Sequence, residues 1–239
     1  FDYNFHRVCD LLDVKKLKEV LNEVNPSVIF HTASNPNTKT NEENPSQIIR
    51  DNIEGTNNLL SLLKNKERVI FTSSATVYGY YNKHNPPNWL TCPRPLSVYA
   101  ATKMACEALV RTYSHQGAID GVSVRIPALV GIEASHGVLK DIIRKSQLDS
   151  NTLELIGTDP GSIRPFVTVN EAAEILYNLA TDFEYGNCLV IGPKDSISVR
   201  EIAEIVLRQL NIKKQIKFCL PSWLGDIQEM YIDPCIKTK

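Results

Sequence analysis

Long apolar runs and an excess of charge of one sign are both missing from this 239-residue sequence. Its longest largely apolar runs, such as 28–30 and 124–130, fall far short of the roughly 20 residues that span a bilayer. Lys and Arg number 26 against 27 Asp and Glu, and there is no long basic block. We therefore expect no membrane span and no nucleic-acid partner. With 43% hydrophobic residues, the chain can still bury a substantial core.

Paired cysteines are missing as well. No two of them have the two-residue gap that is typical of zinc sites and of redox motifs, so we expect no metal and reduced, mostly buried thiols. No signal peptide precedes the first strand-like segment, which makes a cytoplasmic location the expectation. The cysteines are scattered over the chain, at Cys9, Cys92, Cys106, Cys188, Cys219 and Cys235.

Helical and strand-like stretches alternate through the first half of the chain. This alternation is typical of a parallel sheet covered by helices, and it predicts an α/β fold with a Rossmann-like, doubly wound parallel sheet. The pattern predicts helices over 13–25, 46–64 and 97–114, each followed by a strand, at 26–31, 68–74 and 122–127.

The pattern becomes less regular near Gly131, which indicates a second, smaller lobe. We predict a Rossmann-like domain over 1–130 and a mainly substrate-binding lobe over 131–239, with 164–192 returning to the sheet. Within this half, Ser198 has the character of an N-cap, because Glu201 follows three residues later as in a capping box. Helices are expected at 138–147, 170–181 and 199–211, and strands at 153–157 and 188–192.

Tyr99 and Lys103 stand four residues apart in a predicted helix, a spacing that places both side chains on one face. A phenol has a pKa near ~10 and is a poor base unless a nearby cation stabilises its phenolate. Lys103 is such a cation. The alternative is a surface pair without chemistry, but of the nine tyrosines Tyr99 alone is followed by Lys at this spacing.

A hydroxyl-rich segment, Phe71-Thr72-Ser73-Ser74-Ala75-Thr76, ends the strand predicted over 68–74. Ligands of open α/β sheets bind beyond the carboxyl ends of strands, so a site is expected here. The alternative is that these hydroxyls only cap the strand and start the next turn. Together with Tyr99 and Lys103, the segment indicates a catalytic set that includes Ser74.

Five segments stand in the order found in one known family: 28–34, 51–56, 71–79, 97–103 and 164–169. In these segments the chain resembles the extended short-chain dehydrogenase/reductases, in the branch of NAD-dependent epimerases and dehydratases, and most of all the UDP-glucose 4-epimerases. The resemblance implies NAD as the cofactor and a nucleotide-diphospho-sugar as the substrate. It implies that Ser74 bonds a sugar hydroxyl, that Tyr99 is the base, and that Lys103 holds the nicotinamide ribose and lowers the Tyr99 pKa.

The same resemblance assigns further positions around the cofactor. Asp10 matches the residue that accepts a hydrogen bond from adenine, with Leu11 beside the ring. Asn52 matches a residue that braces the cofactor loop, and the remaining matches lie near the pyrophosphate, ribose and nicotinamide, at Thr32, Ala33, Ser34 and Thr72. A helix cap at Asp10 and a buried polar strut at Asn52 are the alternatives.

Arg164 stands where the family grips the substrate diphosphate, a task that suits a planar guanidinium. The alternative is a surface ion pair. Family members often dimerise through the helix that carries the Tyr and Lys and the helix before it, so the resemblance also implies a homodimer.

The sequence departs from the family pattern in the Gly-rich fingerprint that cradles the pyrophosphate at a helix N-terminus, because no such turn occurs in the 239 residues. We therefore expect a fragment or a natural truncation that lacks the first elements of the fold. Such a chain is expected to bind NAD poorly and to expose part of its sheet.

Two substitutions bear on the reaction. Ala128 stands where epimerases and dehydratases usually place an Asn that contacts the sugar nucleotide, and Ala75-Thr76 replace the Asp-Glu pair of the dehydratases. The second change disfavours dehydration, because the acid that protonates the leaving hydroxyl is missing. An epimerase is therefore predicted, with two alternatives: a dehydrogenase of another secondary alcohol, and a noncatalytic NAD-sensing or scaffold protein.

Overall fold

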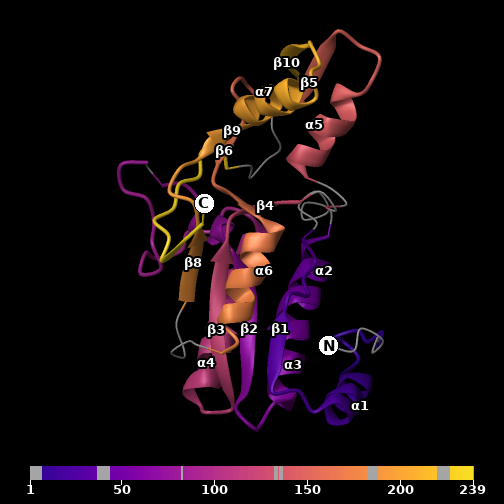
Figure 1. The fold of residues 1–239 in the computed structure, drawn as a ribbon. Coiled ribbons are helices and arrows are strands. Elements are labelled where there is room, and N and C mark those ends of the chain that lie inside the picture. The colour runs from indigo at the N-terminus through magenta and orange to yellow at the C-terminus, as the bar shows by residue number, and fades with distance from the viewer. Residues whose placement is uncertain are drawn as a thin grey trace. The chain divides into compact units, whose positions relative to one another are not determined.

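The computed structural model describes residues 7–36, 44–81, 83–131, 134, 137–181, 188–219 and 227–238. The chain forms two compact units and passes between them several times (Figure 1). The first unit comprises Phe1–Val77, Pro95–Arg125 and Ile175–Leu189. The second unit comprises Tyr78–Arg94, Ile126–Glu174 and Val190–Lys239.

The first unit is built on β1 (Val28–His31), β2 (Glu67–Ser74) and β3 (Ile119–Ile126), which are neighbours in that order. Next comes β8 (Cys188–Gly192), whose first two residues belong to this unit. β1 and β2 are parallel, with His31 opposite Phe71. Their carboxyl ends therefore meet at one edge, and the sheet is mostly parallel with flanking helices, as predicted.

Three helices of this unit begin at polar side chains that accept from free backbone N–H groups, as N-caps do. Asp13 caps α1 (Val14–Val24), Asn44 caps α2 (Pro45–Ile49), and Ser97 caps α4 (Val98–His115). The single helix predicted over 46–64 consists of α2, a π-helical turn η1 (Arg50–Glu54), and α3 (Gly55–Leu62). A short 3₁₀ turn, η2 (Ala75–Tyr78), follows β2.

An apolar cluster holds α3 and α4 against β2. Full burial of one such aliphatic or aromatic side chain stabilises the fold by roughly 1.5–3 kcal/mol. The cluster therefore fixes α4, which carries Tyr99 and Lys103, to the strand that carries Ser74. Its buried members are Leu60, Leu63, Val69, Phe71, Cys106, Val110 and Ile119.

The second unit contains pairs of short strands. β4 (Ala128–Val130) and β7 (Phe166–Thr168) are parallel, as are β5 (Thr152–Ile156) and β10 (Gln215–Cys219), whereas β6 (Ile163–Arg164) and β9 (Ile197–Ser198) are antiparallel. The last residues of β8 pair with β11 (Ile236–Lys237). α6 (Val169–Asn178) passes from this unit into the first.

α5 (Val138–Ser146) and α7 (Val199–Gln209) share a core with β5 that includes Ile142, Leu153 and Ile202. The predicted capping box is confirmed, because Glu201 N donates to Ser198 Oγ at 3.1 Å and Ser198 N donates to Glu201 Oε2 at 2.7 Å. The division of the chain into domains at residue 130 stays a prediction.

Candidate active site

Tyr99 and Lys103 lie one turn apart near the start of α4, in the first unit. Tyr99 is half-buried, whereas the Lys103 side chain is almost fully buried, in a residue that is 3% exposed. The Lys103 Nζ lies 5.8 Å from the centroid of the Tyr99 ring. The helix thus brings the phenol and the amine to one face, as the spacing predicts.

Lys103 also joins α4 to the carboxyl end of β2. Its Nζ donates to the Thr72 carbonyl oxygen at 2.8 Å and lies 4.8 Å from the centroid of the Phe71 ring. Two residues beyond Thr72, the Ser74 Oγ accepts from Thr76 Oγ1 at 2.8 Å and from Thr76 N at 3.2 Å. Both contacts use the oxygen lone pairs, so the Ser74 proton can be donated to a ligand.

Burial dominates the titration of both groups. It lowers the pKa of Lys103 to about 8, against the opposing effect of Cys106 and Glu107, and it raises the pKa of Tyr99 to about 12. The net direction for the Tyr99 pKa is set by burial, and the expected lowering of this pKa by Lys103 stays a prediction. The physical reason is that desolvation disfavours the charged phenolate form.

His31, at the end of β1, is a buried neighbour of this site that the sequence analysis did not single out. Its Nε2 lies 2.9 Å from Thr56 Oγ1, and its carbonyl oxygen accepts from Thr72 Oγ1 at 3.3 Å. Burial, and secondarily the charge of Lys103, lower the His31 pKa to about 4. The imidazole is therefore neutral at neutral pH and adds no second cation beside Lys103.

Asn52 lies inside the π turn η1, and its side chain joins two elements of the site. Its Oδ1 accepts from Asn35 N at 2.7 Å and Ser34 Oγ at 3.2 Å, and its Nδ2 donates to Thr102 Oγ1 at 2.9 Å. The Cys106 thiol donates to the Asn52 carbonyl oxygen at 3.3 Å. π turns of this kind are frequent at functional sites. Asn52 thus braces the segment after β1 against α4.

The remaining predicted cofactor positions also lie in the first unit. Thr32 and Ala33 are exposed directly after β1. Asp10 Oδ1 accepts from Leu12 N at 2.9 Å, and the Leu11 carbonyl accepts from Asn58 Nδ2 at 3.0 Å. The segment that contains Asp10 and Leu11 is therefore held to α3.

Arg164, predicted to bind the substrate diphosphate, belongs to the second unit. Its Nε donates to Ser162 Oγ at 3.2 Å, and its Nη2 donates to the Ile227 carbonyl at 3.2 Å. These bonds fix the guanidinium within that unit.

A buried carboxylate, Glu107, was also missed by the sequence analysis. It lies one turn after Lys103 on α4 and forms an ion pair with Arg125, whose Nη2 is 2.7 Å from Glu107 Oε2. The sequence could have indicated Glu107 by its spacing, because it follows Tyr99 by eight residues and Lys103 by four and so lies on the same helix face.

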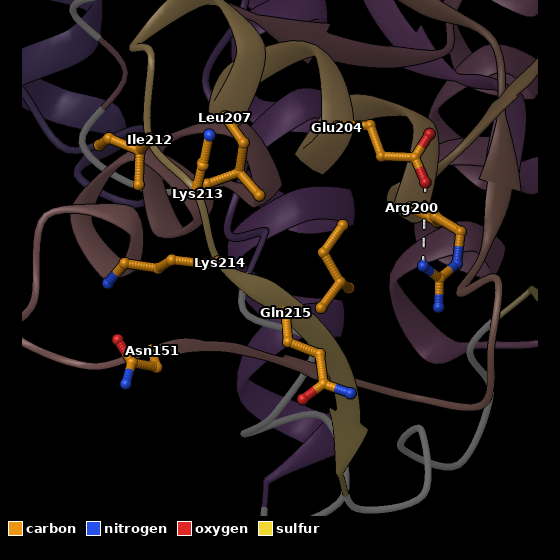
Figure 2. Close-up of a pocket in the computed structure, with 9 residues that line it drawn as sticks. Asn151, Arg200, Glu204, Leu207, Ile212, Lys213, Lys214 and Gln215 are labelled. Carbon is orange, nitrogen blue, oxygen red and sulfur yellow. Dashed lines mark ion pairs between the residues drawn. The ribbon is translucent and has the colours of Figure 1, made fainter.

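An open groove of about 680 Å³ lies in the second unit, between α7 and β10 (Figure 2). Three of its charged side chains are engaged within the unit. Lys214 Nζ donates to the Leu148 carbonyl after α5, and Arg200 lies 2.6 Å from Asp159 and 3.8 Å from Glu204. None of the predicted site residues lines this groove, so it is not the candidate active site.

The sequence model of the NAD dependent epimerase/dehydratase family matches residues 2–192. The chain belongs to this family. Its members depend on NAD, which confirms the family and the cofactor that the sequence predicts. In the part of the chain that the structure describes, no helix is long and apolar enough to cross a membrane.

Individual relatives of this family are enzymes of nucleotide sugars. The chain is 26% identical to UDP-glucuronate 4-epimerase of Thermodesulfobacterium geofontis over 221 residues, which cover 91% of the chain and 67% of the relative. It is 30% identical to UDP-N-acetyl-alpha-D-glucosaminuronate decarboxylase of Bacillus cytotoxicus over 208 residues, or 81% and 62%. The chain thus spans about two thirds of the length of these relatives.

The crystal structure of UDP-glucose 4-epimerase from Thermus thermophilus, in complex with NAD, shares the fold. It superposes with a TM-score of 0.85 and 23% identity, covering 95% of this chain and 75% of that one. This likeness confirms the Rossmann-like architecture.

The donors of the first unit fit the nicotinamide end of NAD. An ammonium group has three protons, and the Thr72 carbonyl accepts one from Lys103, which leaves donors for ribose hydroxyls. At the other end, the Asp10 carboxylate is exposed and can accept from an adenine amino group. The 239 residues contain no Gly-rich turn for the pyrophosphate, so the fit concerns the two ends of the cofactor.

Proposed function

We propose that this chain carries the catalytic set of an NAD-dependent nucleotide-sugar epimerase similar to UDP-glucose 4-epimerase. The observation that supports this most is the placement of Tyr99 and Lys103 on one helix whose Lys103 Nζ lies 2.8 Å from the Thr72 carbonyl, next to Ser74. The proposed cation and hydroxyl donor therefore lie at the carboxyl end of β2, where ligands of α/β sheets bind, and the proposed base lies one helical turn from the cation.

NAD, with its ribose held by Lys103, would supply the hydride acceptor and donor for the sugar carbon. Ser74 donates to the reacting sugar oxygen and orients it. In its phenolate form, the Tyr99 oxygen takes the hydroxyl proton as the carbon is oxidised to a ketone, and the resulting phenol gives this proton back as the ketone is reduced. No net oxidation results. Lys103 would bond the cofactor ribose, and its charge stabilises the phenolate form of Tyr99 before the proton is taken and after it is returned.

The proposed substrate is a nucleotide-diphospho-sugar. Arg164 supports this, because two donors of its guanidinium are held by Ser162 and Ile227, and a fixed guanidinium suits a diphosphate. The names of the relatives support a UDP-linked hexose or hexuronic acid. Ala75 and Thr76, at the place of the dehydratase acids, support epimerisation over dehydration.

Ala128 favours a second candidate, a dehydrogenase of another secondary alcohol. It lies in β4 opposite Phe166, and its methyl group cannot donate the hydrogen bonds of the Asn that the family usually has there. Such an enzyme would use the same Tyr99 and Lys103 but would release its ketone.

Incubation of the protein with NAD and a panel of UDP-sugars distinguishes these functions. We expect UDP-glucose or UDP-glucuronate to be converted to its 4-epimer, detected by NMR, without accumulation of free NADH. Accumulation of NADH with another alcohol, and no conversion of any sugar, would show that the epimerase assignment is wrong. NAD binding without turnover of any alcohol would favour the noncatalytic scaffold.

A further inference from the structure

The carboxylate of Glu107 collects donors from two neighbouring strands. Arg125 Nε donates to Oε1 at 2.9 Å, Arg125 Nη2 donates to Oε2 at 2.7 Å, and Ser73 Oγ also donates to Oε1. The side chains of Glu107 and Arg125 are 9% and 5% exposed. Burying two charges costs desolvation free energy that their attraction barely repays, so this ion pair is not explained by its contribution to stability. A specific role for the pair is the alternative explanation.

Through Ser73, the bonds of Glu107 reach the end of β2 that carries the candidate site. Ser73 stands between Thr72, whose carbonyl accepts from Lys103, and Ser74 of the catalytic set. α4 is therefore attached to the end of β2 at two successive residues, through Lys103 and through Glu107. Because these two side chains are one turn apart on one face, the two attachments fix both the rotation and the axial position of the helix.

We propose that Glu107 is a positioning residue for the proposed reaction, holding Tyr99 and Lys103 on α4 in register with Ser74 on β2. This inference rests on the proposed function of that site. The charge of Arg125 compensates the buried Glu107 carboxylate, and the hydrogen bond from Ser73 fixes this carboxylate to β2. Glu107 itself touches neither the phenol nor the reacting hydroxyl.

The electrostatics of Lys103 support this role. Burial lowers the Lys103 pKa, and the negative charge of Glu107 opposes that effect. The other titratable groups around the amine are Tyr99 and Cys106 on the same helix and His31 on β1, all neutral at neutral pH. If Glu107 loses its charge, Lys103 loses the neighbouring negative charge that opposes its desolvation, and its ammonium form is disfavoured further.

The test compares Glu107→Gln with Asp120→Asn. Asp120 forms the matched control pair with Arg68, with Nη2 and Oδ2 3.2 Å apart and side chains 18% and 11% exposed, and it joins β3 to the opposite end of β2. Two signals are measured by NMR in the ligand-free protein: the titration of the Lys103 ε-carbon and the cross-peak between the Lys103 ε-methylene and the Tyr99 ring.

For Glu107→Gln we expect the Lys103 titration midpoint to fall by about one pH unit and the cross-peak to weaken. For Asp120→Asn we expect both signals to stay as in the wild type. Equal changes in the two variants would mean a general loss of stability, and unchanged signals in Glu107→Gln would mean that Glu107 positions nothing. Either result overturns the inference.

Ser73→Ala keeps the buried ion pair and removes only its link to β2, so it remains decisive if Glu107→Gln does not fold. We expect the cross-peak to weaken and, with a substrate, kcat to fall about tenfold at unchanged KM. A cross-peak of wild-type strength in Ser73→Ala overturns the inference. Because the NMR signals need no substrate, failure of the wild type to convert any UDP-sugar would count against the proposed function alone.

Discussion

The Lys103 ammonium nitrogen lies 2.8 Å from the carbonyl oxygen of Thr72, the residue two positions before Ser74. This bond joins the helix that carries the phenol to the strand that carries the hydroxyl donor. It also holds the amine where burial lowers its pKa to about 8. The same contact therefore orients Lys103 and brings its titration close to neutral pH, which leads to specific expectations for variants.

Replacement of Tyr99 by Phe removes the proposed proton acceptor and keeps the ring. We expect turnover of the UDP-sugar to fall by about a hundred- to ten-thousandfold, the usual contribution of general acid–base catalysis. Tyr113→Phe is the matched control, because Tyr113 lies on the same helix and its hydroxyl donates to Asn57 at 3.1 Å. Similar losses in both variants would contradict the assignment of Tyr99 as the base.

Lys103→Met is expected to make the protein inactive and more stable at pH 7. The folded-state pKa of about 8 lies below the ordinary 10.5, so the folded chain binds fewer protons than the unfolded chain between these values. Wild-type stability therefore rises with pH through this window, and below pH 8 the buried ammonium costs about 3 kcal/mol. Urea unfolding should show that the variant exceeds the wild type in free energy of unfolding at pH 7, and that this difference is smaller at pH 10. A difference that is the same at both pH values would refute this account.

Asn52→Ala is expected to weaken NAD binding about tenfold, equivalent to roughly 1.4 kcal/mol. The reason is that the segment after β1 loses its bonds from Ser34 and Asn35 to the π turn. Isothermal titration calorimetry with NAD measures the change in the dissociation constant. Asn57→Ala, which removes a single bond from Tyr113, is the control and should bind NAD as the wild type does.

His31 should make the protein sensitive to acid. Its pKa is lowered from 6.5 to about 4, so the folded state binds fewer protons than the unfolded state between these values, and stability falls as pH decreases through this window. The loss should reach about 3 kcal/mol at pH 4. His31→Gln should reduce this slope in urea unfolding at pH 7, 5 and 4. An equal reduction in His115→Gln, an exposed position, would show that His31 is not the cause.

Gly161→Ala should destabilise the second unit by about 1–3 kcal/mol. Gly161 has φ +79°, and a Cβ there would lie 2.7 Å from the Val199 Cβ at the start of α7. Gly117 is the control position, because it has a similar φ of +74° but no atom within 4 Å of such a Cβ. Its replacement by Ala therefore introduces the backbone strain without the clash. We expect Gly117→Ala to cost about 1 kcal/mol in thermal or urea unfolding. Equal losses would mean that the contact with Val199 has no effect.

Local patterns in the sequence were sufficient for several regular elements and for the juxtaposition of Tyr99 and Lys103. The period of apolar residues predicted α1 and α4, and four-residue spacing on a helix placed Tyr99 beside Lys103, because these features depend on near neighbours in the chain. The capping box at Ser198 and Glu201 was predictable for the same reason. The π turn was not, since its Asn52 carbonyl bonds Cys106, more than fifty residues away.

The sequence by itself determined the family, the mostly parallel α/β architecture and the positions of Tyr99, Lys103 and Ser74. Only the tertiary structure decided the electrostatic state of that set. It buried Lys103 and Tyr99, which lowers the pKa of the first and raises the pKa of the second, and it paired Glu107, one turn after Lys103, with Arg125. Residues that are distant in the sequence bury a charged group and provide its partners. The spacing of residues along the chain therefore cannot predict how far its pKa is shifted.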